Sequence, residues 1–222
     1  MKFGALLAVV AAGSLMAGCA ATAKETNSAS SADVGTESNG VPFPSTYQAY
    51  PSQATAITGV TIFDGEGGRI DNGTVFMADG KIQAVGDSDM TYPADTLVLD
   101  GTGKFATPGI IDVHSHLGNY PTPSVRAHSD GNDATSPVTP EVWAEHSVWP
   151  QDPGFSRAMA NGGITSLQIL PGSANLFGGR SATLKNVPSR TVQRMKFPGA
   201  PYGMKMACGE NPKRVYGSRN RM

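Results

Sequence analysis

The 222-residue chain has few of the residues that mark several common classes of protein. Its two cysteines, Cys19 and Cys208, lie far apart and in different contexts, which excludes a disulfide framework. It has four histidines but no histidine-rich or cysteine-rich tract, which excludes a metal-trafficking role. No charge of one sign dominates, because 17 Lys and Arg face 18 Asp and Glu. Neither nucleic acid nor an electrostatically attracted membrane surface is therefore an expected partner.

Long apolar runs are also scarce, and the one that occurs lies at the start of the chain. Lys2 is followed by GALLAVVAAGSLMA, which is too short for a membrane span and typical of a signal peptide. This stretch ends in LMAGC, which resembles a bacterial lipobox with cleavage before Cys19 and a lipid on its sulfur. Residues 1–18 are thus predicted to be a lipoprotein-type signal peptide, with an ordinary secretory signal as the alternative. The expected location is the bacterial cell envelope, membrane-anchored only through the lipid or periplasmic.

The next segment, residues 19–50, is predicted to be a tether. Residues 20–40 are rich in Ser, Ala, Thr and Asn and have no aromatic residue, so they cannot bury a core. Residues 41–51 are a more structured lead-in, which three prolines keep extended.

Residues 51–104 carry several short strand patterns separated by turn signals. Strands are predicted at ITGVTIF, on both sides of Asp79-Gly80, and at TLVL, and Asp79-Gly80 is the dipeptide of a tight type I′ hairpin. This spacing predicts part of a small β-sandwich rather than a βαβ unit.

The most informative stretch is FATPGIIDVHSHL, residues 105–117. If residues 110–116 form a strand, Asp112, His114 and His116 project from one face, because side chains alternate with period two. Two imidazoles so placed can share one divalent cation, with Zn–N distances of about 2.0–2.1 Å. The alternative is a pair of ordinary surface or core histidines. The apolar residues of the run predict a parallel strand that is buried on both faces.

The sequence PGIIDVHSHL is similar to the first-strand motif of the amidohydrolase superfamily, and the resemblance covers roughly residues 56–222. It implies an α/β fold in which residues 105–222 form the amino-terminal part of a (β/α)8 TIM barrel. It also implies hydrolysis of a non-peptide carbon–nitrogen bond, such as a cyclic or acyl amide, by metal-activated water. The resemblance also implies that the protein binds one or two divalent metal ions, with zinc expected, and acts on a small-molecule substrate. Imidazolonepropionase-like relatives are the nearest in pattern, and a dipeptidase-like hydrolase is an alternative.

The resemblance further implies a carboxylate ligand at the end of a barrel strand. Glu210 is favoured because it follows the predicted strand at residues 203–208, and carboxylated Lys205 is the alternative. Asp112 is expected to orient an imidazole. Arg180 is a candidate for binding a substrate carboxylate, and His146 is a candidate substrate contact from the long loop at residues 118–150.

Two helices are predicted in this region. The first covers residues 141–148, and the second begins at Asp152-Pro153, runs through FSRAMAN and is ended by Gly162-Gly163, before a parallel strand at residues 164–170. Too few residues follow Pro108 for a whole barrel of ~250 residues, so the chain is expected to be an amino-terminal part whose general acid/base Asp lies beyond Met222. The rival hypothesis is a non-catalytic envelope lipoprotein, a truncated remnant that acts as a binding module. The unpaired strand edges of a partial barrel leave room for an oligomer.

Overall fold

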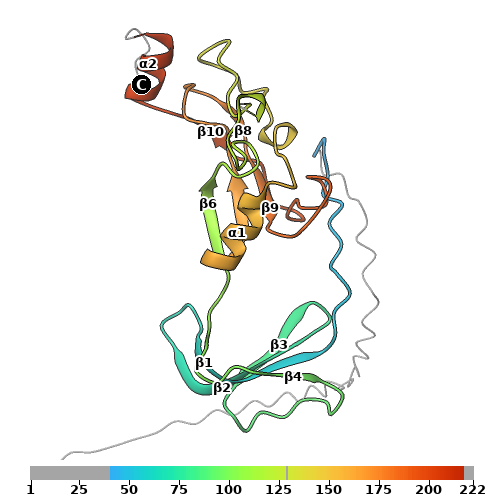
Figure 1. Cartoon of the computed structure of the whole chain (residues 1–222). Helices are drawn as coiled ribbons and strands as arrows, with labels where there is room; N and C mark the ends of the chain where they lie inside the picture. The colour runs from blue at the N-terminus through green and yellow to red at the C-terminus, as the bar shows by residue number, and fades with distance from the viewer. Residues whose placement is uncertain (1–40, 129, 218–222) are drawn as a thin grey trace, which may run out of the picture. The chain divides into compact units, whose positions relative to one another are not determined.

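The computed structural model describes residues 41–128 and 130–217, which form a mixed α/β structure (Figure 1). The predicted signal peptide, Cys19 and the tether up to residue 40 lie outside the described residues. Within the described ranges, no helix combines the length and the apolar character that spanning a bilayer requires.

The elements of the described residues follow one another in this order: β1 (Thr55–Phe63), β2 (Arg69–Ala78), β3 (Lys81–Gly86), β4 (Leu97–Asp100), β5 (Phe105–Ala106), β6 (Ile110–Ser115), η1 (Arg126–His128), η2 (Ala144–His146), α1 (Pro153–Gly162), β7 (Ile164–Ile169), β8 (Gly179–Arg180), β9 (Ala182–Lys185), β10 (Met204–Lys205) and α2 (Glu210–Tyr216). Here η denotes a 3-10 helix.

The first five strands form one sheet in the order β3-β2-β1-β4, with β5 also paired to β1. Its small core contains Val60, Ile62 and Val75. The predicted hairpin is confirmed, because Asp79 and Gly80 both have positive φ, at 53° and 69°, as a type I′ turn requires. Within the described residues, the segment predicted to be part of a β-sandwich, residues 51–104, contributes strands to a single sheet.

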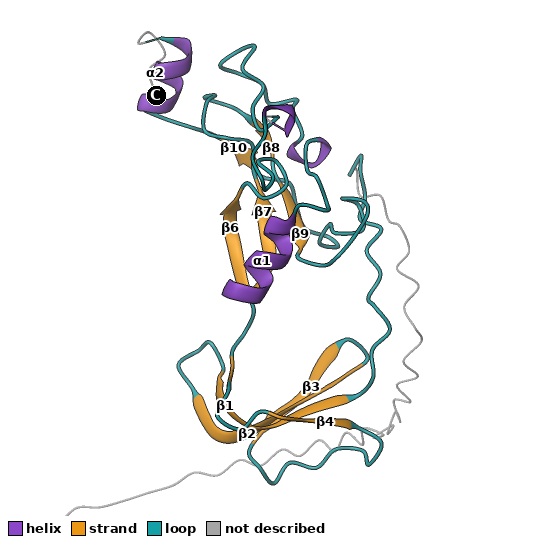
Figure 2. Ribbon diagram, viewed as in Figure 1, coloured by secondary structure: helices purple, strands orange, loops and turns teal. Residues whose placement is uncertain are grey.

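A second sheet, in the order β6-β7-β9, carries the predicted metal-ligand strand (Figure 2). Strands β6 and β7 pair in parallel through the crossover helix α1, as predicted. Leu167, Ile169 and Leu184 are fully buried in its core, where Phe155 of α1 packs against them. Both ends of α1 follow the sequence signals: Asp152 caps the first turn, and Gly163 ends the helix with a φ of 61°.

Strand β6 is less buried than the sequence suggests. Ile111 is 64% exposed and Val113 is 69% exposed, so the prediction of burial on both faces is wrong for the described residues. Among the described residues, β6 is the edge strand of a three-stranded sheet, with β7 as its strand neighbour, and nothing covers the side chains of Ile111 and Val113.

Two other predicted elements differ in extent. The helix expected at residues 141–148 is only the 3-10 turn η2, because Thr139 does not cap it but donates its hydroxyl to the Phe177 carbonyl. The strand expected at residues 203–208 is reduced to β10, two residues that pair antiparallel with β8. The second neighbour of β7 is β9, which is antiparallel, so no third parallel strand follows β7 in the described residues.

The buried carboxylate of Asp152 joins α1 to the loop that follows β6. It accepts backbone hydrogen bonds from Gly118 (3.0 Å), Thr122 (3.0 Å) and Gly154 (2.8 Å). Replacing Asp152 by alanine is expected to lower the free energy of unfolding by roughly 2–4 kcal/mol, because three N–H groups lose their acceptor. Urea denaturation followed by circular dichroism measures this loss.

The matched control is Asp71→Ala, which removes an exposed carboxylate whose ion pair with Arg69 spans 2.7 Å. Surface pairs contribute little, so the control should change the free energy of unfolding by less than about 1 kcal/mol. An equally small effect at Asp152 would contradict the clamping role.

Candidate functional site

His114, near the end of β6, and His116, which follows the strand, lie together at the carboxyl end of β6. Their ring centroids are 5.2 Å apart, as expected from their spacing on one face. The parallel pairing of β6 and β7 brings Leu170, just after β7, to the same edge. His116 Nδ1 lies 2.8 Å from the Leu170 carbonyl oxygen and donates a proton to it. This hydrogen bond fixes the tautomer and leaves the Nε2 lone pair of His116 available to a metal.

The third member of the site is Lys205, at the end of β10. Its Nζ lies 3.1 Å from His114 Nε2, across 91 positions of sequence. Lys205 is only 5% exposed, and this burial lowers the pKa of its amine. The positive charge of Lys205 is the main reason that the pKa of His114 is lowered, and burial adds to the effect.

The structure brings Lys205, not Glu210, to the histidines. Glu210 begins α2, where its side chain is 91% exposed and pairs with Lys213 at 3.4 Å. The sequence predicts a ligand at the carboxyl end of a strand, but β10 ends at Lys205 rather than at residue 208. In the described parts of the chain, no three His, Cys, Asp or Glu side chains are grouped closely enough to hold a metal ion.

Asp112 shares the ligand face but binds main chain. Its carboxylate accepts a hydrogen bond from the backbone N–H of His114 at 3.1 Å. Its negative charge raises the pKa of the His114 ring and so partly opposes Lys205. Asp112 therefore acts on His114 through the backbone and through its charge.

Sequence reasoning missed Tyr120, whose ring packs edge-on to His116 with centroids 5.6 Å apart. The Tyr120 hydroxyl accepts a hydrogen bond from Asn132 Nδ2 at 2.6 Å, and burial raises its pKa. An aromatic residue four positions after the second histidine is the one signal that could have found it. The long loop thus places an aromatic side chain in contact with one of the two histidines.

The two candidate substrate contacts lie at a different cluster of rings. The Arg180 guanidinium stacks over Trp143 at 4.4 Å from the ring centroid, and His146 packs edge-on to Phe43 at 4.7 Å. Phe43 in turn contacts Trp143. The structure brings Arg180 and His146 to one aromatic cluster, and their contact with a substrate stays a prediction.

Replacing Lys205 by methionine is expected to raise the pKa of His114 toward its ordinary value of 6.5, because the nearby positive charge is removed. In the native chain the unfolded state binds a proton at His114 more readily than the folded state does. Stability therefore falls as the pH drops from 6.5 through the folded-state pKa, and the variant should show a smaller fall. A titration of the imidazole signals by 1H–15N NMR in chelator-treated protein measures the pKa.

Lys213→Met is the control for this titration, since Lys213 pairs with Glu210 on α2. It should leave the pKa of His114 unchanged. An unaltered pKa in the Lys205 variant would mean that the two groups do not interact in solution.

Comparisons with known proteins find relatives in one superfamily. No family model matches the chain. It is 36% identical to the amidohydrolase tasK of Hapsidospora irregularis over 159 residues, which are 68% of this chain and 16% of that protein. It is 43% identical to the imidazolonepropionase of Geobacillus sp. (strain WCH70) over 54 residues, 22% of this chain and 13% of that enzyme.

A solved structure gives the same indication. The crystal structure of an amidohydrolase from Thermotoga maritima MSB8 matches 75% of this chain and 42% of its own, with a TM-score of 0.67 and 41% identity. The chain thus spans less than half the length of each of these three proteins. Its relatives belong to the amidohydrolase superfamily, and the mixed α/β fold is shared with one of them.

Proposed function

We propose that this chain is part of a metal-dependent amidohydrolase that cleaves a carbon–nitrogen bond other than a peptide bond, and that residues 105–217 are part of its (β/α)8 barrel. The observation that carries the proposal is the contact of Lys205 with His114, beside His116, at the carboxyl ends of β6 and β10. In barrel enzymes the strand ends at this face carry the chemistry. Relatives named for amide and imidazolone hydrolysis support the same reaction class.

Two imidazoles, together with a carboxylate formed on Lys205, would suit a divalent cation. In neutral His116, the hydrogen bond from Nδ1 to the Leu170 carbonyl leaves the lone pair on Nε2. The lowered pKa of His114 keeps its ring neutral over more of the pH range. Zinc is the expected ion, since imidazole nitrogen and carboxylate oxygen are among its preferred ligands. When bound, the metal would lower the pKa of a water molecule and polarise the scissile carbonyl.

Lys205 is proposed to supply a carboxylate after its amine adds to carbon dioxide. The amine must be unprotonated to react, and burial lowers its pKa in that direction. The neutral amine forms an N–C bond to the carbon of carbon dioxide and releases one proton. Counted from the protonated amine, two protons leave as the cation beside His114 becomes a carbamate anion. The role first assigned to Glu210 thereby passes to Lys205. A general acid/base and further ligands have to come from outside the set of His114, His116 and Lys205.

The proposal predicts a carbamate on this chain. Incubation of the full chain with zinc and 13C-bicarbonate should give a new carbonyl signal by 13C NMR, and Lys205→Arg should abolish it because arginine stays protonated. Lys213→Arg is the matched control and should keep the signal. A spectrum without the signal at saturating bicarbonate and zinc would contradict the proposed ligand.

The rival function is a non-catalytic binding module derived from such an enzyme. The observation that favours it is that, within the described residues, no three His, Cys, Asp or Glu side chains form a group that could hold a metal ion. A remnant has no need to retain a cation, so zinc content after dialysis separates the two: one or two equivalents support the hydrolase, and none supports the remnant.

A further inference from the structure

A pocket lies between the lead-in segment and the chain that follows β9. Hydrogen bonds to several of its residues hold the lead-in segment in place. Beside this pocket, Ser45 Oγ donates to the Lys196 carbonyl (2.7 Å), the Thr46 N–H donates to the Gln193 carbonyl (2.9 Å), and the Tyr50 hydroxyl donates to the Pro188 carbonyl. The volume enclosed is about 590 Å³, within the range of small-molecule sites, ~300–1,000 Å³. Its lining consists of residues 47–51 and Val187, Pro188, Ser189, Arg190 and Arg194.

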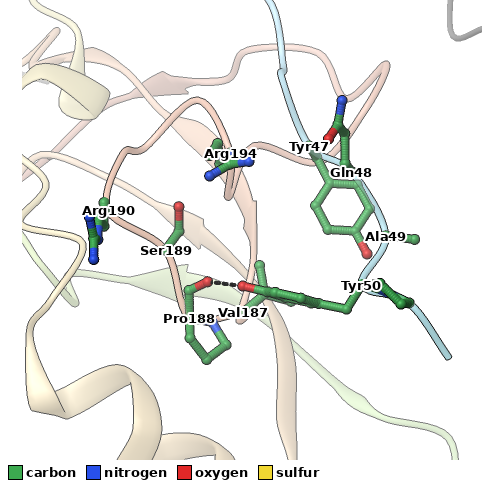
Figure 3. A pocket seen from close by; sticks show the side chains of 10 residues that line it. Tyr47, Gln48, Ala49, Tyr50, Val187, Pro188, Ser189, Arg190 and Arg194 are labelled. Atoms are coloured by element: carbon green, nitrogen blue, oxygen red, sulfur yellow. Dashed lines mark hydrogen bonds between the residues drawn. The ribbon is translucent and has the colours of Figure 1, made fainter.

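Two arginines give this pocket its charge. Figure 3 shows Arg190 and Arg194 on the side opposite Tyr47 and Gln48, with Tyr50 along the rim where it meets Pro188. No Asp or Glu lines the pocket, and within the described residues neither guanidinium has an ion pair or a hydrogen bond to another side chain. Both positive charges are therefore available to a ligand.

The sequence around the pocket adds to the positive electrostatic potential of these two arginines. No Asp or Glu occurs from residue 153 to residue 209, whereas Lys or Arg occurs seven times, and no acidic residue occurs from residue 38 to residue 63. Both walls of the pocket come from these acid-free segments. Two acidic side chains near the start of the first segment are already engaged, Glu145 by Lys196 and Asp152 by backbone N–H groups. The net charge of −1 for the whole chain thus conceals a local excess of positive charge.

The ligand class follows from the charge and the walls. Two guanidinium groups carry a charge of +2, which matches a phosphate monoester, about −1.5 to −2 at pH 7, better than a single carboxylate. Lys185 does not line the pocket but lies nearby, with its Nζ 4.8 Å from the centroid of the Tyr47 ring and 4.7 Å from that of Phe197. The tyrosine rings, Val187 and Pro188 offer apolar area to the organic part of such a ligand.

We propose that this pocket binds a small phosphate monoester, with the phosphate on Arg190 and Arg194 and the organic group against the tyrosine wall. This site is separate from the histidine pair, and the inference does not rest on the proposed hydrolase activity.

Calorimetric titration of the full chain with phenyl phosphate tests the proposal. Binding is expected, and Arg190→Gln and Arg194→Gln should each weaken it by about 10-fold or more, because each removes charge-assisted hydrogen bonds. Arg157→Gln is the matched control, an exposed arginine of α1 that does not line the pocket, and it should leave the dissociation constant unchanged. Both pocket arginines are exposed, so all three variants should keep the native circular dichroism spectrum.

Two further arms identify the ligand chemistry. Succinate, a dianion without phosphate, should bind at least 10-fold more weakly than phenyl phosphate, and equal affinity would overturn the phosphate assignment. Co-sedimentation with vesicles of phosphatidylcholine and phosphatidylglycerol, without binding of phenyl phosphate, would overturn the soluble ligand in favour of a lipid surface. Equal affinity in native chain and arginine variants would overturn the site itself.

Discussion

His114→Ala is expected to remove most of one equivalent of bound zinc from the chain. The variant loses one of two adjacent imidazoles and also the contact of that imidazole with Lys205. Replacing a residue that only orients a metal ligand through a hydrogen bond already lowers metal affinity by about 10–100-fold. We therefore expect the zinc affinity to fall by more than about 100-fold. Elemental analysis after dialysis against zinc and then against buffer measures the loss. In the hydrolase proposed above, His114→Ala should abolish hydrolysis, because the metal that would activate the water is lost.

The matched control is His146→Gln, which alters an exposed imidazole that packs against Phe43. Its zinc content should equal that of the native chain. If His114→Ala retained its zinc, or if a hydrolase carrying this change stayed active, the metal site would not be at β6.

The largest expected effect on stability comes from Glu145→Gln. Glu145 is fully buried and accepts from Lys196 Nζ at 2.7 Å and from the Tyr202 hydroxyl at 2.7 Å. Lys196 also donates to the Phe43 carbonyl, which ties the lead-in segment to this group. The amide leaves the Lys196 charge buried without a counter-ion, so we expect a loss of about 3–5 kcal/mol in the free energy of unfolding. Burial and the bond to the carboxylate together raise the pKa of Tyr202, which therefore stays a donor throughout.

Two causes of this loss can be separated: the unpaired charge of Lys196 and the lost hydrogen bonds. Thermal and urea unfolding are compared for Glu145→Gln and for a double variant that combines Glu145→Leu with Lys196→Met. The double variant removes both charges and should recover most of the loss, as apolar replacements of buried ion pairs often do. If the double variant were as unstable as Glu145→Gln, the hydrogen bonds of Tyr202 and Phe43, rather than the unpaired charge, would account for the effect.

The sequence by itself determined the features that depend on a few neighbouring residues. Alternation along residues 110–116 places His114 beside His116, since the pleat of a strand repeats every two residues wherever the strand lies. Asp79-Gly80 selects its hairpin because both residues tolerate positive φ. Asp152 and Gly163 begin and end α1 for equally local reasons, a side-chain acceptor and a left-handed backbone.

Only the tertiary structure decided which distant residues meet these local features. The short pairing of β10 with β8 ends one strand at Lys205, which selects that amine over Glu210 as the partner of His114. The exposure of β6 reflects the absence of a covering element among the described residues, which its own composition does not reveal. Contacts across 91 positions depend on how strands pair and where they stop, and no local preference for φ and ψ encodes that.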